Sequence, residues 1–315
     1  MKYIVDLAVS GKIREYGMVV ALLLICGIFS ITSPVFLTQP NIANILNQVA
    51  INAVLAVGAT FVILSGGIDL GLGSYVAITG VLTAMSVQNE AFPLPVGLAV
   101  GLCSGTIIGL INGVVITKGK IAPFVVTLGM MTITRGAALV ISNGRPVSNL
   151  SDSFNDISVN SLFGVQYPII IVLVVIAAAA IILNKTIFGR RVYAVGGNDE
   201  ATRAAGISVD RVKIYVYALA GGLAGLAGIL QASRITTGQP NIGVGYELDA
   251  IAAVVIGGTS LSGGFGKLSG TIVGALIIGV INNGLDLLNV SSYYQQIVKG
   301  SIIIGALLLD INRKK

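Results

Sequence analysis

TIFGRRVYAVGGNDEATRAAGISVDRVK, residues Thr186–Lys213, decides the fold class, because it is a charged island between two apolar runs that can each cross a membrane. The runs are Tyr167–Leu183 before the island and Ile214–Ala232 after it. A helix needs about 20 apolar residues to span the hydrocarbon core of a bilayer. A membrane protein keeps such a loop in water for a reason, and we expect contact with a soluble partner.

The composition of the whole chain agrees with a membrane protein. Of 315 residues, 55% are hydrophobic and only 10% are charged, and the mean hydropathy is +0.93. Soluble domains carry about 25% charged residues, so these charges are too few to cover a globular surface. Lipid is therefore the solvent for most of the chain.

The sequence contains no motif that would make it an enzyme. It has no His, which removes the commonest general base, and no glycine run is followed by the Lys-Ser/Thr of a nucleotide-binding P-loop. Basic residues never cluster with aromatic ones, as a nucleic-acid surface would require. We expect no catalytic residue, no metal, no cofactor and no nucleic-acid partner.

Apolar runs along the chain predict an all-α, polytopic integral membrane bundle of about ten transmembrane helices in a single domain, residues 1–315. The three short runs, which begin at residues 74, 250 and 296, are expected to be tilted, broken or extended. The runs are Met18–Leu37, Ile42–Leu64, Ser74–Val87, Val96–Thr117, Ile121–Ile141, Tyr167–Leu183, Ile214–Ala232, Ala250–Leu261, Leu268–Leu288 and Gln296–Leu309.

The distribution of basic residues predicts the orientation. If the N-terminus is cytoplasmic and all ten segments cross, 15 of the 19 Lys and Arg residues lie on the cytoplasmic side. The outer loops then hold only Arg145 and Arg234, as the positive-inside rule expects. Both termini and the island at 186–213 are predicted to be cytoplasmic, and the loop at 142–166 is predicted to form an ordered polar cap outside.

Two similar glycine-rich stretches predict turns or re-entrant backbone. GGIDLGLG at Gly66–Gly73 and GGTSLSGG at Gly257–Gly264 share the pattern GG-x-x-L-x-x-G. Such backbone is tolerated at membrane depth only when protein surrounds it or when it lines a cavity. We expect Asp69 to cap the next helix near Leu72–Ser74, with an ion-coupling carboxylate as the alternative. The candidate gate or turn residues are Gly66, Gly67, Asp69, Gly257 and Gly258.

Polar residues at helical spacing form two stripes inside apolar segments. The first stripe contains Asn44, Gln48 and Asn52, and the second contains Asn282 and Asp286, with Asn283 beside it. They line a path for a hydroxylated solute, or they hold helices together by hydrogen bonds. A single buried Arg135 is expected to extend its side chain to the outer interface.

The island itself has the signals of a short helix. Asn198, Asp199 and Glu200 place acidic groups at a helix start, and Gly206 can end it. A helix of this length is not stable alone and needs a surface to pack against.

At Glu200-Ala201, with Gly206 six positions on, the island resembles the EAA loop of ABC importer permeases. Thr202 replaces the second Ala of that motif and the usual Leu-Pro ending is missing, which resembles the monosaccharide-type permeases related to branched-chain amino acid permeases. The resemblance implies docking to an ATP-hydrolysing subunit. The implied docking residues are Gly197, Asn198, Asp199, Glu200, Ala201, Arg203 and Gly206.

The resemblance covers essentially the whole chain. Leu64–Ser74, Phe188–Ile207, Gly245–Gly266 and Asn282–Gly300 are similar to sugar permeases of this family, and the last two favour ribose over another pentose, a hexose or a signalling sugar. The resemblance implies a multi-pass protein of the bacterial cytoplasmic (inner) membrane. Its implied partners are a second permease copy, a cytoplasmic ABC ATPase, an extracytoplasmic sugar-binding protein and membrane lipid.

Two other classes of protein remain open. A secondary transporter driven by an ion gradient would need a buried, titrating carboxylate, for which Asp69 and Asp286 are the candidates. A structural membrane scaffold would leave the polar stripes and the island without a purpose.

Overall fold

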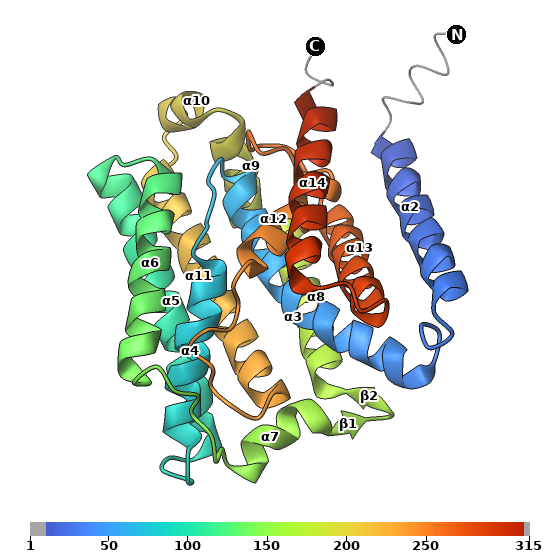
Figure 1. Cartoon of the computed structure of the whole chain (residues 1–315). Coiled ribbons are helices and arrows are strands. Elements are labelled where there is room, and N and C mark those ends of the chain that lie inside the picture. Colours follow the sequence, from blue (N-terminus) through green and yellow to red (C-terminus); the bar gives the residue numbers. More distant parts are fainter. Residues whose placement is uncertain (1–10, 312–315) are drawn as a thin grey trace.

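The computed structural model describes residues 11–311, which form a bundle of helices (Figure 1). One two-residue hairpin pairs Ser161 with Gln166 and Leu162 with Val165. The helices and strands are α2 (Gly11–Thr32), α3 (Gln39–Leu64), α4 (Leu72–Val87), α5 (Leu94–Gly119), α6 (Pro123–Ile141), α7 (Asp152–Val159), β1 (Ser161–Leu162), β2 (Val165–Gln166), α8 (Tyr167–Lys185), α9 (Ile187–Gly197), α10 (Asp199–Ala204), α11 (Val209–Arg234), α12 (Tyr246–Ile256), α13 (Leu268–Leu287) and α14 (Ser292–Ile311).

Each of the ten predicted apolar segments overlaps a helix, so the all-α prediction is confirmed. Six helices in the described part of the chain, α3, α5, α6, α8, α11 and α13, are long and apolar enough to cross a membrane. The segment predicted at Ala250–Leu261 was misplaced. Its helix α12 begins at Tyr246, after Gly245 in the left-handed region, and ends at Ile256 because Gly257 and Gly258 break it.

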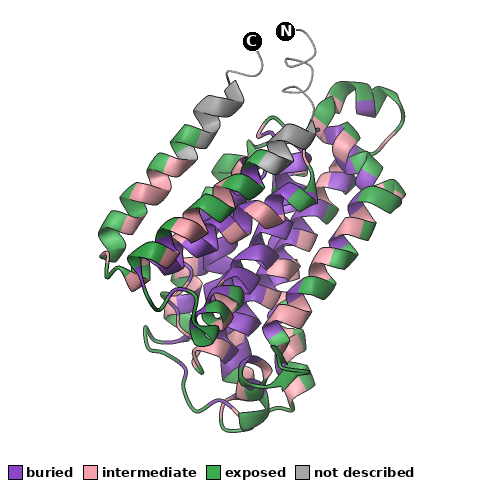
Figure 2. Ribbon diagram, turned by 90° about the vertical axis from the view of Figure 1, so that its right-hand side faces the viewer, coloured by how far each residue is buried: buried purple, intermediate pink, exposed green. Residues whose placement is uncertain are grey.

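Helices α3 and α11 lie at the centre of the bundle. In their most apolar stretches 83% and 61% of the residues are buried, against 17% for α6 at the edge of the bundle (Figure 1). Figure 2 shows the buried residues gathered in the interior of the bundle. Helix α11 crosses α5 at very short range, since a Cβ added at Gly221 would overlap the backbone of Gly105. Small residues at crossings let helices pack closely where lipid, and not water, surrounds them. Exposed apolar side chains such as Val140 and Val174 then face the lipid.

Among the helices that fall on the predicted apolar segments, α4 and α12 are too short to cross a bilayer unaided. The eleven residues of α12 span only about 16 Å, and α4 has 16 residues. Non-helical backbone at 65–71 precedes α4, and non-helical backbone at 235–245 precedes α12. Both segments are only partly buried, since Asp69 and Gly238 are buried whereas Gly66 and Val244 are exposed. Protein surroundings are what irregular backbone needs at membrane depth.

The two ends of the bundle differ in character. Helix α10 lies at the same end as the start of α2 and the end of α14, whereas α7 and the hairpin lie at the opposite end (Figure 1). The polar loop at 142–166 is ordered, as predicted, because α7 buries Phe154 completely against the bundle.

Candidate functional site

The charged island folds into an arm of two short helices, α9 and α10. The Thr186 side chain caps α9 by accepting a hydrogen bond from the Gly189 N–H (3.1 Å). The Asn198 side chain caps α10 by accepting from the Ala201 N–H (2.8 Å). Between the two helices the Thr202 hydroxyl donates to the Ala194 carbonyl oxygen (2.9 Å). This hydrogen bond holds α9 and α10 in a defined orientation relative to each other.

The end of α10 is formed by a glycine, as the sequence predicted. Gly206 has φ +81°, and its N–H donates to the Arg203 carbonyl oxygen (2.9 Å). The next N–H, of Ile207, donates to the Thr202 carbonyl oxygen (3.2 Å). This left-handed ending satisfies carbonyl groups that a helix end otherwise leaves unpaired.

Replacing Gly206 with alanine is expected to loosen α10, because a side chain in the left-handed region costs about 1 kcal/mol. A Cβ at this position meets no atom within 4 Å, so the effect is conformational and not steric. Amide hydrogen exchange of residues 199–205 should be faster in Gly206→Ala. Gly206→Asn is the control and should exchange more like the wild type, since Asn tolerates this conformation. Equal rates in all three chains would contradict the prediction.

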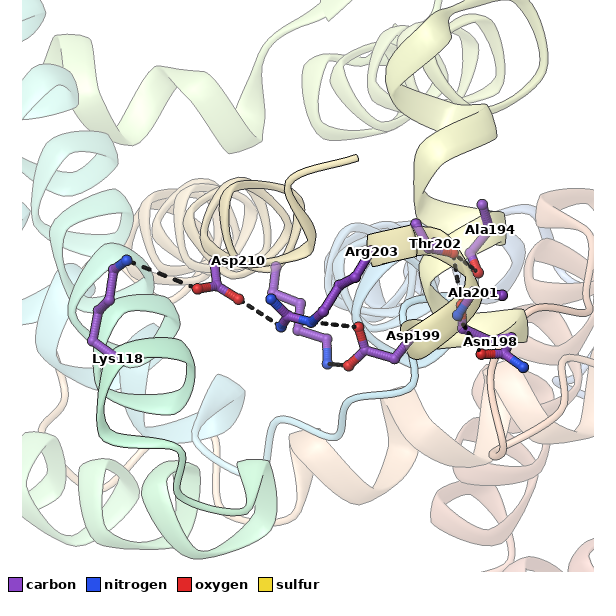
Figure 3. Close-up of polar contacts among 9 residues, drawn as sticks. Lys118, Ala194, Asn198, Asp199, Ala201, Thr202, Arg203 and Asp210 are labelled. Carbon is purple, nitrogen blue, oxygen red and sulfur yellow. Dashed lines mark hydrogen bonds and ion pairs between the residues drawn. The ribbon is translucent and has the colours of Figure 1, made fainter. Parts of the chain in front are cut away.

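A chain of ion pairs ties α10 to α11 and α5 (Figure 3). Arg203 donates to Asp210 (2.7 Å) and also lies 3.5 Å from Asp199. Lys213 bonds the other oxygen of Asp199 (2.8 Å), and Lys118 of α5 lies 3.8 Å from Asp210. Donating to Asp210 raises the pKa of Arg203, so this residue keeps its charge. Exposed pairs contribute little singly, but linked together they fix the position of α10.

One face of α10 is exposed and forms no contact with the described part of the bundle. Glu200 and Ala201 are exposed, and within residues 11–311 the Glu200 carboxylate forms no hydrogen bond or ion pair. The inward face carries the buried Thr202. The short helix is therefore anchored on one side and exposed on the other.

A contact between glycines and the last carbonyl group of α3 joins the arm to the bundle. We call it the glycine junction: Gly196 of α9, Gly66 after α3, and Gly263 and Gly264 before α13. The Gly264 N–H donates to the carbonyl oxygen of Leu64, the last residue of α3 (2.9 Å). A Cβ added at Gly196 would overlap that carbonyl oxygen, and one added at Gly263 would lie 2.8 Å from the Gly66 nitrogen. Three segments distant in sequence thus touch through bare backbone.

The glycines that were predicted to form turns end two helices, α3 and α12, in a similar way. Gly66 (φ +79°) ends α3, and Gly258 (φ +90°) ends α12. Gly67 and Gly257 are buried beside them. The sequence pattern aligns Gly66 with Gly257, but the residue with positive φ that corresponds to Gly66 is Gly258. The two helix ends are therefore shifted by one residue relative to the shared pattern.

Asp69 differs from its predicted role in detail. It accepts the N–H of Gly71 (2.8 Å) and not one of Leu72–Ser74, because the chain makes its turn one residue before α4. The same oxygen, Oδ1, accepts from the Tyr75 hydroxyl (3.1 Å). That hydroxyl in turn accepts from Asn112 Nδ2 of α5 (2.6 Å). The carboxylate therefore ties the non-helical segment 65–71 to α4 and α5.

A polar cavity of about 70 Å³ lies among five helices, α3, α11, α12, α13 and α14. A salt bridge closes one wall, since Lys299 of α14 donates to Asp249 Oδ2 of α12 (2.9 Å). Asn282 Nδ2 of α13 donates to the same oxygen (3.2 Å). The lining polar side chains are Gln48, Asn52, Gln231, Arg234, Tyr246, Asp249, Asn282, Gln295 and Lys299.

The structure brings only part of the two predicted polar stripes together. Gln48, Asn52 and Asn282 line the cavity. Asn44 lies at its edge, where it accepts from Arg234 (2.8 Å). The remaining two residues turn elsewhere. Asn283 exchanges two hydrogen bonds with Asn41 of α3 (2.9 and 3.0 Å), and the exposed Asp286 accepts from Gln295 (2.8 Å).

Several residues of the cavity carried no recognisable pattern in the sequence. Gln231 and Lys299 are single polar residues on apolar helices, and no spacing connects them. Arg135 binds the backbone of the non-helical segment 235–245, a contact that the sequence did not predict. It donates to the carbonyl oxygens of Pro240 (3.0 Å) and Ile242 (2.6 Å), which the non-helical segment 235–245 leaves without helical partners.

Comparison with known proteins identifies close relatives of the chain. Residues 41–307 match the family described as branched-chain amino acid transport system / permease component. The ribose import permease protein of Escherichia coli strain K12 is 48% identical over 96% of this chain and 95% of its own. That of Bacillus subtilis strain 168 is 47% identical over 97% and 95%. The L-arabinose ABC transporter permease protein of Azospirillum brasilense is 40% identical over 96% and 89%. No solved structure matches.

Proposed function

The chain belongs to the permease family of branched-chain amino acid transport systems, and from this premise we propose that it is the membrane subunit of an ATP-driven sugar importer. The whole chain acts as one transmembrane domain of the bacterial cytoplasmic membrane. ATP hydrolysis takes place in a separate cytoplasmic subunit, and an extracytoplasmic binding protein delivers the sugar.

Ribose is the proposed substrate. The ribose permeases of two distant bacteria are 48% and 47% identical to this chain, against 40% for the L-arabinose permease. All three matches cover nearly the whole chain, so the difference does not come from unequal overlap. Another pentose remains the second candidate.

The ATPase is proposed to dock on α10. The single observation that carries this proposal is the arm itself: its partner-facing side, with Glu200, is exposed, while its other side is held by ion pairs and the glycine junction. Closure of the ATPase then moves α9 and α10, and the junction passes the motion to α3 and α13.

The arm's position also supports the proposed orientation. The start of α2, the end of α14 and the arm share one end of the bundle (Figure 1), which we assign to the cytoplasm together with its basic residues. We propose ten membrane passes, in which the segments 65–71 and 235–245 supply the length that the short helices α4 and α12 lack. Two copies are proposed to form the importer, with exposed apolar faces toward lipid and toward each other.

A charge reversal on α10 tests the docking proposal. In proteoliposomes holding the complete importer, ribose uptake should require ATP and the binding protein. Glu200→Lys should lower uptake by about tenfold or more, because reversal of a charge at an interface costs more than about 1.4 kcal/mol. Glu90→Lys, an equal reversal at the opposite end of the chain's bundle, is the control and should transport normally. Full uptake by Glu200→Lys would contradict docking at α10, and uptake driven by an ion gradient without the ATPase would contradict the function.

A further inference from the structure

Three buried acceptor oxygens around the polar cavity have no hydrogen-bond partner among the described residues. They are Gln231 Oε1, Asp249 Oδ1 and Asn282 Oδ1, on α11, α12 and α13. Their residues are 5%, 3% and 4% exposed. Buried acceptors are normally paired, because an unpaired one has lost its water without compensation. Three of them on one cavity mark a place where donors from outside the chain bind.

The arrangement of donors explains why these oxygens are unpaired. Lys299 Nζ and Asn282 Nδ2 both donate to Asp249 Oδ2, at 2.9 and 3.2 Å, so Oδ1 is left without a donor. The other cation of the cavity, Arg234, donates to Asn44 at its edge. The cavity thus has more acceptors than its own side chains use.

The charges of the cavity select the chemistry of the ligand. An anionic group such as a carboxylate only accepts hydrogen bonds, so it would leave all three oxygens unpaired. An ammonium or metal cation is repelled by Arg234 and Lys299, which face Asp249 as the only acidic residue of the lining. A neutral molecule with several hydroxyl groups fits, because each hydroxyl donates to one residue and accepts from another.

The cavity has to open before such a molecule can enter. Its volume of about 70 Å³ is far below the roughly 300 Å³ of the smallest ordinary ligand pockets. The wall that can move is α14, since no residue of its described part is buried and it lies at the edge of the bundle (Figure 2). The Lys299–Asp249 ion pair is the charged link between α14 and α12 at this wall.

We propose that the polar cavity is a closed binding site for the hydroxyl groups of a monosaccharide, and that the Lys299–Asp249 ion pair is the latch that the sugar displaces. When α14 moves outward, Asp249 exchanges the lysine for sugar hydroxyls, and Gln231 and Asn282 take further hydroxyls. The proposal rests on the proposed function, because it places the transported sugar within one permease copy.

A tryptophan reporter tests the site without transport. The chain contains no Trp, and Tyr246 lines the cavity, so Tyr246→Trp places a single fluorophore there. The full chain in detergent micelles is titrated with ribose. We expect a saturable change in Trp emission at millimolar ribose. Adding Asn282→Ala should raise the half-saturating concentration by about tenfold, which corresponds to about 1.4 kcal/mol.

The neighbouring residue is a matched control. Asn283 is equally buried on the same helix, but it pairs with Asn41 away from the cavity. Asn283→Ala should lower thermal stability and leave the half-saturating concentration within about twofold. Lys299→Met should lower that concentration by about threefold or more, because the latch no longer competes, whereas Lys299→Arg keeps the pair and should behave as the parent chain.

The outcomes separate this proposal from the proposed function. An unchanged emission in a chain whose complete importer takes up ribose would overturn the site and leave the function intact. Equal effects of Asn282→Ala and Asn283→Ala would also overturn it. If the importer takes up no ribose but another monosaccharide gives the saturable, Asn282-dependent signal, the site stands and the substrate assignment falls.

Discussion

Replacing Gly196 with alanine is expected to separate the ATPase-facing arm from the bundle. The added Cβ would overlap the carbonyl oxygen of Leu64 and lie 2.6 Å from the nitrogen of Gly264, the two atoms that share a backbone hydrogen bond. Both are main-chain atoms of packed segments, so neither can turn aside as a flexible side chain would. Overpacking of this kind costs about 1–3 kcal/mol, and here it also breaks the hydrogen bond.

The functional result should exceed the loss of stability. In the complete importer, Gly196→Ala should lower ATP-driven uptake by about tenfold or more, while the separate ATPase still hydrolyses ATP, because motion of α9 no longer reaches α3. Gly136→Ala, on α6 and outside the arm and the junction, is the control. A Cβ there meets no atom within 4 Å, so uptake and thermal stability should stay near the wild type. Equal uptake by the two variants would contradict the prediction that the glycine junction transmits motion from the arm to the bundle.

The sequence predicted the ten helices and the arm because each depends on local signals. Apolar runs, a capping Asn198 and the ending Gly206 act over a few residues, and the structure has helices where those signals lie. The polar stripes were also readable, since residues three and four apart share a helix face. Two of the six residues lie away from the cavity: Asn283 pairs with Asn41, and the exposed Asp286 accepts from Gln295.

Contacts between distant segments could not be predicted in the same way. The glycine junction brings Gly66, Gly196 and Gly264 together. A glycine has no side chain whose chemistry could indicate which segment it packs against. Residues 235–245 fall between two predicted apolar runs, but hydropathy does not show which helices this segment packs against. Its contact with Arg135 could not be predicted, because the partners are main-chain carbonyls that any residue would present.

The variant Asp69→Asn tests whether import is driven by ATP or coupled to an ion gradient through this carboxylate. We expect it to keep ATP-driven uptake at half the wild-type rate or better. The side chain is 3% exposed, and a single oxygen, Oδ1, accepts from both Gly71 and Tyr75. An asparagine amide retains that acceptor oxygen, so both hydrogen bonds can persist without the charge. A carrier that moves protons through this carboxylate would lose transport completely.

Removing the acceptor should have a different and larger consequence. Asp69→Ala leaves the buried Tyr75 hydroxyl without its acceptor and frees the segment 65–71, which should lower the free energy of unfolding by about 2–4 kcal/mol. The midpoint of thermal unfolding in detergent measures this loss, and Asp69→Asn should stay near the wild type. If Asp69→Asn is as stable as the wild type yet fails to transport, the carboxylate has a role in ion coupling that its hydrogen bonds do not explain. Normal uptake by the same variant leaves Asp69 as the residue that holds the non-helical segment in place.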